Sequence, residues 1–360
     1  MTLQSLIDAI RPLNQENMEK ASRHIDNLLK PLGSLGRLEE LAIHLSGMPG
    51  ISSLQNLQKE IIVMCADHGV YDEGVAISPK NATAIQARNM LKGLTGVCVL
   101  AKNSGTYVLP VDIGIDCEPI EQMLSLKLAR GSGNIVQGAA MDYEQAEMLL
   151  LASAQLVKQR IAAGITIFGI GEMGIANTTS AAAVISVLTG SDPCDVVGLG
   201  ANFPIERLTH KQSIVRQAIA INQPDNKNAI DVLAKVGGFE LVGMTGVILG
   251  AAASGMPVVL DGFLSYASAL AASQISPVAR DYCIPSHMSA EKGAKLALRH
   301  LNLHPYLNLG LRLGEGSGAA IAMSLIDAAC TMYCHMGTLV NSGICFPASK
   351  RPYIERPLRI

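Results

Sequence analysis

The sequence has 360 residues, with 28 Lys and Arg against 30 Asp and Glu, so its formal net charge is -2. This balance excludes a broad positive surface for nucleic acid or for a membrane of anionic lipid, and we expect small molecules or other protein chains as partners. Hydrophobic residues make up 49% and charged residues only 16%, which predicts a large buried core and a surface partly covered by a second subunit.

Both ends of the chain have the spacing of helices. Residues 1–28 show helical periodicity that Pro12 interrupts, and the opening MTLQSLIDAIRPLNQ lacks the charged start and apolar run of a signal peptide, so we expect a cytoplasmic protein. Residues 319–336 predict another helix. We therefore predict a small helical domain built from both termini. The predicted boundaries are 29–285 for a large α/β domain, 1–28 with 286–345 for the small domain, and 346–360 for a C-terminal tail.

Between the two ends, short apolar runs alternate with helical segments. Apolar runs that end in small or acidic residues predict strands buried on both faces, over residues 60–66, 107–111, 165–168, 196–197 and 257–260. Helical spacing predicts helices over residues 82–100, 143–163, 178–188, 231–253 and 266–274. Strands that alternate with helices form parallel sheets with right-handed crossovers. The predicted fold class is α/β, a doubly wound Rossmann-like parallel sheet.

Residues 241–260 carry no charge and are long enough to cross a membrane as a helix. Four glycines and Pro257 interrupt this stretch, and its end has the character of a short strand that enters a loop. We expect a buried helix followed by a strand, and no membrane partner.

Ligands of open parallel sheets lie beyond the carboxyl ends of the strands, where loops and helix N-termini meet. This rule places on one edge Asp67, His68, Asp112, Asp116, Gly171, Glu172, Gly198, Gly200, Asn202 and Asp261.

The first candidate segment at this edge is GIGEMGIANTTSAAA, residues 169–183, which leaves a strand and enters a helix at Asn177 and Thr178. Backbone N–H groups at a helix N-terminus bind phosphate, and glycines let a ligand approach the backbone closely. Its GxGxxG match is weak, because Glu172 would repel a pyrophosphate. A tight turn with a hydroxyl cap is the alternative.

The second segment is LRLGEGSGAA, residues 311–320, with one carboxylate, Glu315, among Gly314, Gly316 and Gly318. Burial there would raise the pKa of Glu315 toward the range of a general base, while the N-terminus of the following helix would lower it. A glutamate that completes a local helix cap explains the pattern equally well.

A third cluster suggests a different chemistry. Asp67 and His68 follow one strand, and Asp112 and Asp116 follow another, which is a pattern that suits the metal ions of a phosphoesterase. Hydrogen-bonded loop braces are the simpler interpretation. The eight cysteines show no CxxC spacing, so we expect neither disulfides nor a zinc site. We expect no metal and no cofactor. A nucleotide-binding module without catalytic activity remains a further alternative.

An ordered series of motifs over about residues 30–340 resembles one family. The series includes KPLGSLGRLEELA at 30–42 and GSGNIVQGAAM at 131–141, together with residues 66–69, 111–116, 169–183, 231–253, 258–263, 286–293 and 311–320. Together these segments are similar to the nicotinate-nucleotide:dimethylbenzimidazole phosphoribosyltransferases, which make the lower-ligand nucleotide of cobalamin. The order of the motifs is more specific than any one of them.

The resemblance implies a reaction and a fold. Members transfer phosphoribose from nicotinate mononucleotide to a nitrogen of 5,6-dimethylbenzimidazole, which gives α-ribazole 5'-phosphate and nicotinate, with inversion at the anomeric carbon and no metal requirement. The family fold has a Rossmann-like sheet and a small helical domain from both termini. Members are homodimers.

The resemblance also implies roles for individual residues. Glu315 matches the general base, and Glu172 a second carboxylate near the ribose. Gly174, Asn177 and Thr178 would hold the phosphate. Other residues implied near the substrates are, for the phosphate, Lys211, Gly200 and Asn202; for the aromatic base, Ser78, Gln86, Met173 and Leu313; and, close to the ligands, Ser289 with Gly314, Gly316 and Gly318.

Three positions depart from the family pattern. An aromatic residue is common where this chain has Ser78, a glycine where it has Ala176, and an asparagine where it has Cys98. Ser78 would affect which aromatic base the protein prefers, because this side chain is implied to border the base. Ala176 would affect the backbone geometry near the phosphate, and Cys98 would remove a polar contact on a crossover helix. None of the three changes Glu315.

Overall fold

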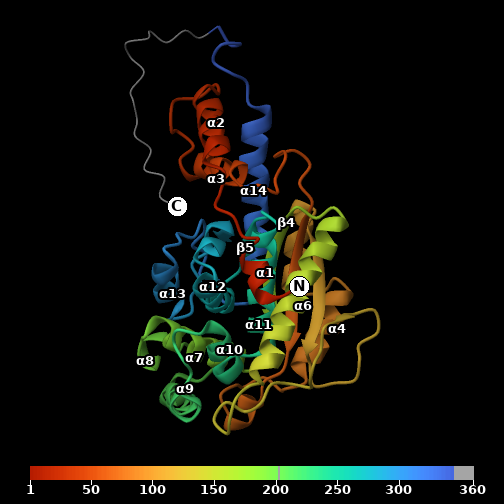
Figure 1. Cartoon of the computed structure of the whole chain (residues 1–360), viewed down its shortest axis with the longest axis vertical. Helices are drawn as coiled ribbons and strands as arrows, with labels where there is room; N and C mark the ends of the chain where they lie inside the picture. Colours follow the sequence, from red (N-terminus) through yellow and green to blue (C-terminus); the bar gives the residue numbers. More distant parts are fainter. Residues whose placement is uncertain (202, 344–360) are drawn as a thin grey trace.

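The computed structural model describes residues 1–201 and 203–343 (Figure 1). Its centre is a six-stranded sheet in the order β3-β2-β1-β4-β5-β6, and all neighbouring strands are parallel. The predicted doubly wound α/β fold is confirmed. From β1 the chain builds one half of the sheet through β2 and β3, and from β4 it builds the other half through β5 and β6. The strand order therefore reverses between β1 and β4, and folds of this kind bind their ligands at such a switch point.

The strands agree with most of the apolar runs. They are β1 (Lys59–Ala66), β2 (Tyr107–Gly114), β3 (Leu124–Ser125), β4 (Ile167–Met173), β5 (Val258–Leu260) and β6 (Cys283–Pro285). Every residue of β1 is buried, which explains the uninterrupted apolar run from Ile61 to Ala66 after the charged residues Lys59 and Glu60. The strand predicted over residues 196–197 is wrong. Asp192 caps and Pro193 begins a short helix there, α8 (Pro193–Val196), and both features favour a first helical turn.

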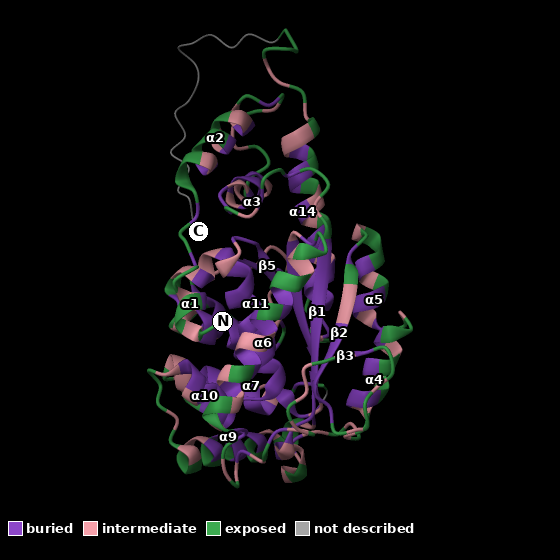
Figure 2. Cartoon of the chain, turned by 45° about the vertical axis from the view of Figure 1, so that its right-hand side comes forward, coloured by how far each residue is buried: buried purple, intermediate pink, exposed green. Residues whose placement is uncertain are grey.

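Helices cover both faces of the sheet (Figure 2). On one face α11 (Phe239–Ala253) packs so closely that a Cβ on Gly243 would meet Ile113 and Met64, and α6 (Tyr143–Ala162) lies against α11. On the other face α14 (Ser317–His335) packs against Gly169 of β4 through Met323. The helices α4 (Ala82–Leu91) and α5 (Gly96–Ala101) also contact the sheet, both of them β2.

Two predicted helices are each divided in two. The helix expected over 82–100 becomes α4 and α5, because Gly93 between them adopts a left-handed φ of 73°. The helix expected over 231–253 becomes α10 (Ala229–Val236) and α11, because Gly237 and Gly238 leave the helical region. The other three predictions are confirmed by α6, α7 (Asn177–Thr189) and α12 (Phe263–Ile275).

Helices from the two ends of the chain lie together beyond one end of the sheet (Figure 1). There α3 (Arg37–Ser46) packs against both α2 (Gln15–Asp26) and α14, whereas α1 (Leu3–Ile7) contacts α11. The domain boundaries predicted above stay a prediction, and the tail 346–360 lies outside the described residues. The remaining helices are α9 (Leu208–Asn222), α13 (Ala294–Leu301) and the 3-10 helices Gly69–Glu73, Lys102–Ser104, Ile205–Arg207 and Pro277–Tyr282.

The uncharged stretch over residues 241–260 forms most of α11, which is buried over nearly its whole length, and then β5. Within the described residues α14 is the helix long and apolar enough to cross a membrane by length and composition, and 56% of that stretch is buried inside the protein. Burial of this extent is typical of a core helix in a folded domain.

Candidate active site

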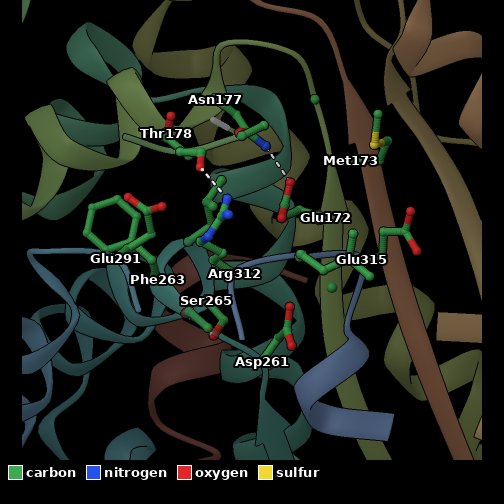
Figure 3. Close-up of a pocket in the computed structure, with 18 of the residues that line it drawn as sticks. Glu172, Met173, Asn177, Thr178, Asp261, Phe263, Ser265, Glu291, Arg312 and Glu315 are labelled. Atoms are coloured by element: carbon green, nitrogen blue, oxygen red, sulfur yellow. Dashed lines mark hydrogen bonds between the residues drawn. The ribbon is translucent and has the colours of Figure 1, made fainter. Parts of the chain in front are cut away.

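A cavity of about 410 Å³ opens at the carboxyl ends of the strands near the switch point. Both Gly-rich segments reach it, although more than a hundred residues separate them in sequence (Figure 3). The predicted site residues that line it are Ser78, Gln86, Glu172, Met173, Gly174, Asn177, Thr178, Gly200, Ser289, Leu313, Gly314 and Glu315.

The backbone around Glu315 forms an unusual turn. Gly314, Glu315 and Gly316 have φ values of 85°, 63° and 92°, all in the left-handed region that glycine tolerates best. The Glu315 N–H donates to the carbonyl oxygen of Glu172 at 3.2 Å. A Cβ on Gly171 would lie only 2.4 Å from the Glu315 carbonyl oxygen. Gly171 therefore permits the turn at Gly314, Glu315 and Gly316, here named the Glu315 turn, to lie directly on β4.

The Glu315 side chain is buried, with 4% of the residue exposed, and it lines the cavity. Its Oε1 accepts from Gln86 Nε2 at 3.4 Å, and its Oε2 accepts from the Val97 N–H at 3.3 Å. Burial raises the pKa of Glu315, and the hydrogen bonds from Val97, Gly96, Gln86 and Thr95 oppose this shift. A carboxylate of raised pKa, held in place by long hydrogen bonds, is suited to accept a proton.

Glu172 is the second carboxylate of the cavity, and Asn177 donates a hydrogen bond to its Oε2 (Figure 3). Burial raises the pKa of Glu172 to about 8, with further contributions from the nearby carboxylates Asp261 and Glu240, while Asn177 opposes the shift. Glu172 belongs to β4, as do Gly169 and Gly171. The prediction that the strand ends at residue 168 and that the chain leaves it at these glycines, through a loop, is therefore wrong. They are strand positions where α14 and the Glu315 turn pack closely.

Asp261, directly after β5, holds the Glu315 turn from the other side. Its Oδ2 accepts from the Gly316 N–H at 3.1 Å, and its Oδ1 accepts from the Gly318 N–H at 2.6 Å. Burial raises the pKa of Asp261 to about 7, and these backbone donors oppose the shift. Gly316 and Gly318 thus bind Asp261 at the N-terminus of α14, and neither lines the cavity. Sequence reasoning placed Asp261 at this edge but gave it no role.

The N-terminus of α7 forms another part of the cavity wall, with Gly174, Asn177 and Thr178. Lys211 lies behind it, with 2% of the residue exposed, and its Nζ donates to Thr178 Oγ1 at 2.8 Å. Burial lowers the pKa of Lys211 to about 8, and Glu291 opposes this. Lys211 therefore acts on the cavity through Thr178. Asn202, also predicted here, lies outside the described residues.

The four residues of the alternative metal site are engaged with other groups. Asp67 accepts from the Asp116 N–H at 2.8 Å, and Lys80 pairs with the Asp116 carboxylate at 3.0 Å. Asp112 pairs with Lys127 at 2.8 Å. His68 Nε2 lies 3.0 Å from Glu240 Oε1, with both side chains fully buried. Within residues 1–201 and 203–343, no three His, Cys, Asp or Glu side chains are placed to hold a metal ion. The metal-dependent phosphoesterase is not supported.

Comparison with known proteins identifies the family. A family model described as phosphoribosyltransferase matches residues 10–344. The chain belongs to this phosphoribosyltransferase family. A relative from Yersinia enterocolitica, named nicotinate-nucleotide:dimethylbenzimidazole phosphoribosyltransferase, is 62% identical over 96% of this chain and 98% of its own length. A relative of the same name from Photorhabdus laumondii is 61% identical over 96% of this chain and 99% of its own length.

A solved structure of the phosphoribosyltransferase of the same name from Thermus thermophilus has the same fold. It is 37% identical, with a TM-score of 0.86, and the match covers 93% of this chain and 100% of that one. The family resemblance expected from the ordered motifs is therefore confirmed.

The structure also locates the three departures from the family pattern. Ser78 lines the cavity, and Cys98 lies in α5, where its Sγ donates to the Met90 carbonyl oxygen at 3.4 Å. Ala176 has a φ of 76° at the N-cap of α7, directly before the residues expected to bind phosphate. A side chain in this left-handed conformation is strained. The chain thus carries backbone strain beside its cavity.

Replacing Ala176 by Gly should stabilise this phosphoribosyltransferase. Relief of the left-handed strain contributes about 1 kcal/mol, partly offset by the greater entropy of glycine in the unfolded chain. We expect Tm to rise by about 1 to 3 °C in differential scanning fluorimetry. Ala152→Gly, in the middle of α6, is the control and should lower Tm. A lower Tm for Ala176→Gly would show that the alanine methyl makes contacts that outweigh the strain.

The buried acids predict how stability depends on pH. Glu172 and Asp261 have pKa values raised to about 8 and about 7, against about 4 in an unfolded chain. Between these values the folded state binds more protons than the unfolded state at these two groups, so their contribution to stability is fully present below about pH 4 and is lost as pH rises toward 8. The Tm of Glu172→Gln minus that of the wild type should therefore increase from pH 5 to pH 8. A constant difference would show that Glu172 is already ionised at pH 5.

Proposed function

We propose that this chain transfers phosphoribose from nicotinate mononucleotide to 5,6-dimethylbenzimidazole in cobalamin nucleotide-loop assembly. The products are α-ribazole 5'-phosphate and nicotinate. The observation that carries the proposal is the buried Glu315 carboxylate, which lines the same cavity as Glu172 and the N-terminus of α7. The names of the relatives from Yersinia enterocolitica and Photorhabdus laumondii support the same reaction.

In the proposed mechanism the substrates supply most of the chemistry. One nitrogen of the benzimidazole attacks the anomeric carbon, and Glu315 takes the proton from the N–H of the other nitrogen. The bond from the anomeric carbon to the pyridinium nitrogen breaks, and its electron pair neutralises that nitrogen as nicotinate leaves. The enzyme therefore positions two substrates and removes one proton.

The other cavity residues fit the remaining parts of the substrates. We assign the phosphate to Gly174, Asn177, Thr178 and Gly200, where helix N–H groups favour an anion. We assign the benzimidazole to the side chains around Glu315, which are Ser78, Gln86, Met173 and Leu313. Glu172 would face the ribose, and its ionised form, the minor form at neutral pH because burial raises its pKa to about 8, would stabilise positive charge that develops at the anomeric carbon.

A direct assay tests this proposal. Purified protein incubated with nicotinate mononucleotide and 5,6-dimethylbenzimidazole should release nicotinate and form α-ribazole 5'-phosphate, both measurable by chromatography. Saturable binding of the mononucleotide without product over long incubation would instead support a binding module. Competition among several benzimidazoles, phenols and purines would then rank the acceptors. This ranking matters because Ser78 lines the cavity at a position where an aromatic residue is common in the family.

The chain is also proposed to act as a cytoplasmic homodimer. Exposed apolar side chains on α4, after α4 and on α5 support an interface with a second copy of the chain. Ile85, Leu94 and Val99 are each about half exposed or more in the single chain, and a second subunit would cover them. Light scattering should give twice the mass of one chain, and a monomeric mass would overturn this part without affecting the chemistry.

A further inference from the structure

Arg312 is a charged residue of the cavity that neither the motifs nor the proposed mechanism has used (Figure 3). Four carboxylates line the same cavity, those of Glu172, Asp261, Glu291 and Glu315, and Arg312 is the one Lys or Arg among the described lining residues. Its Nη1 donates to the Gly200 carbonyl oxygen at 3.4 Å. Within the described part of the chain its guanidinium forms no ion pair with a carboxylate, so most of its donors are available to a ligand.

The contacts of Arg312 place it at the phosphate end of the cavity. Gly200 lies against Thr178, because a Cβ on Gly200 would be 3.0 Å from Thr178 Oγ1. Thr178 belongs to the first turn of α7. Lys211 reaches the same threonine from behind and does not line the cavity. The cation that faces the ligand at this end is therefore Arg312.

Arg312 also shares a loop with Glu315. Residues 302–316 contain no helix or strand and connect α13 to α14. The Leu311 carbonyl oxygen accepts from the Ala290 N–H at 3.0 Å, and the Glu315 N–H donates to Glu172 at 3.2 Å, so backbone bonds hold the loop just before Arg312 and at Glu315. Between these two points the Arg312 side chain links the loop to the segment that contains Gly200.

We propose that Arg312 couples the phosphate of the nucleotide to the position of Glu315. The guanidinium binds the phosphate dianion at the N-terminus of α7, and this contact fixes the loop that carries the general base three residues later. Binding energy from a part of the substrate that does not react is then used to orient the reacting groups. A guanidinium suits this role because it can hold a phosphate through two parallel hydrogen bonds. The proposal rests on the proposed function above.

The test removes the phosphate from the substrate and returns it as a separate ion. Wild type, Arg312→Ala and Arg312→Lys are compared with nicotinate mononucleotide and with nicotinate riboside, which lacks the phosphate, with and without phosphite dianion. Arg130→Ala, an exposed arginine paired with Glu118, is the matched control. Tm shows whether each variant is folded, and calorimetry measures its affinity for the mononucleotide.

We expect Arg312→Ala to lower kcat/KM for the mononucleotide by about 10-fold to 100-fold, with part of the loss in kcat, and to lower turnover of the riboside much less. Phosphite should accelerate the riboside reaction of the wild type and not that of Arg312→Ala. Guanidinium ion should restore part of the activity of Arg312→Ala. The kcat/KM of Arg312→Lys for the mononucleotide should lie between the values of the wild type and of Arg312→Ala.

Several results would overturn the proposal. Equal losses on both substrates would show that Arg312 does not act through the phosphate, and full phosphite activation of Arg312→Ala would show the same. A loss confined to KM would show phosphate binding without coupling to Glu315. A folded wild type that turns over neither substrate would contradict the proposed function itself, and this result is distinct from all the others.

Discussion

Replacing Glu315 by Gln should lower kcat by about 100-fold to 10,000-fold and leave the affinity for nicotinate mononucleotide largely unchanged. Glutamine keeps the size of the side chain and can still accept a hydrogen bond from Gln86 or from the Val97 N–H, so the cavity should keep its shape. The amide cannot take the benzimidazole proton at neutral pH. The loss therefore belongs to the step in which that proton is removed.

Steady-state kinetics and calorimetry of the mononucleotide check this result together. Glu118→Gln, at an exposed position away from the cavity, is the control and should behave like the wild type. An equal loss of affinity and rate would assign Glu315 to recognition of the ground state. In the wild type, kcat should fall as pH decreases through the raised pKa of Glu315, and Glu315→Gln should lose that limb of the profile.

Sequence reasoning located this site because both Gly-rich segments hold a glutamate next to a helix start. The rule that ligands lie beyond the carboxyl ends of parallel strands selected Glu172, whereas Glu315 was selected by its neighbouring glycines, the helix that follows it and the family resemblance. The structure places both side chains in one cavity, and Asp261, which the same rule selected, lies beside them. Asp261, which directly follows β5, and the two glutamates, which lie among glycines before a helix, could therefore be located from local sequence pattern.

Residues whose role depends on contacts distant in sequence could not be found in this way. Lys211 appears in the sequence as a cation near the phosphate, but its burial behind Thr178 follows only from the packing of α9 on α7. Arg312 has no distinctive neighbours in sequence, and its position is defined by a contact with Gly200, more than a hundred residues away. Its place in the LRLGEGSGAA segment was the one available signal.

The errors in secondary structure have a similar origin. Val196 and Val197 are buried and apolar, as strand residues are, but Asp192 and Pro193 determine the local backbone. The glycines of β4 suggested a loop because a strand rarely needs glycine. Here the requirement comes from elements that pack onto the strand from 140 or more residues later in the chain.

This requirement makes Gly171→Ala a severe substitution. Its Cβ would lie 2.4 Å from the Glu315 carbonyl oxygen and 2.5 Å from the Gly316 nitrogen, both of them backbone atoms. Moving the turn away would break hydrogen bonds. The Glu315 N–H donates to the Glu172 carbonyl oxygen, and the Gly316 and Gly318 N–H groups donate to the Asp261 carboxylate. We expect kcat to fall by about 100-fold or more, since a displacement of about 1 Å at a reacting group has an effect of this size.

The same clash should also lower the free energy of unfolding by about 1 to 3 kcal/mol, as overpacking of a core usually does. Gly138→Ala is the matched control, because a Cβ there has no neighbouring atom within 4 Å, and it should leave kcat and Tm near the wild-type values. Urea denaturation and steady-state kinetics of the two variants provide the comparison. Wild-type kcat in a folded Gly171→Ala would show that the turn bearing Glu315 tolerates displacement, and that its close contact with β4 does not position the general base.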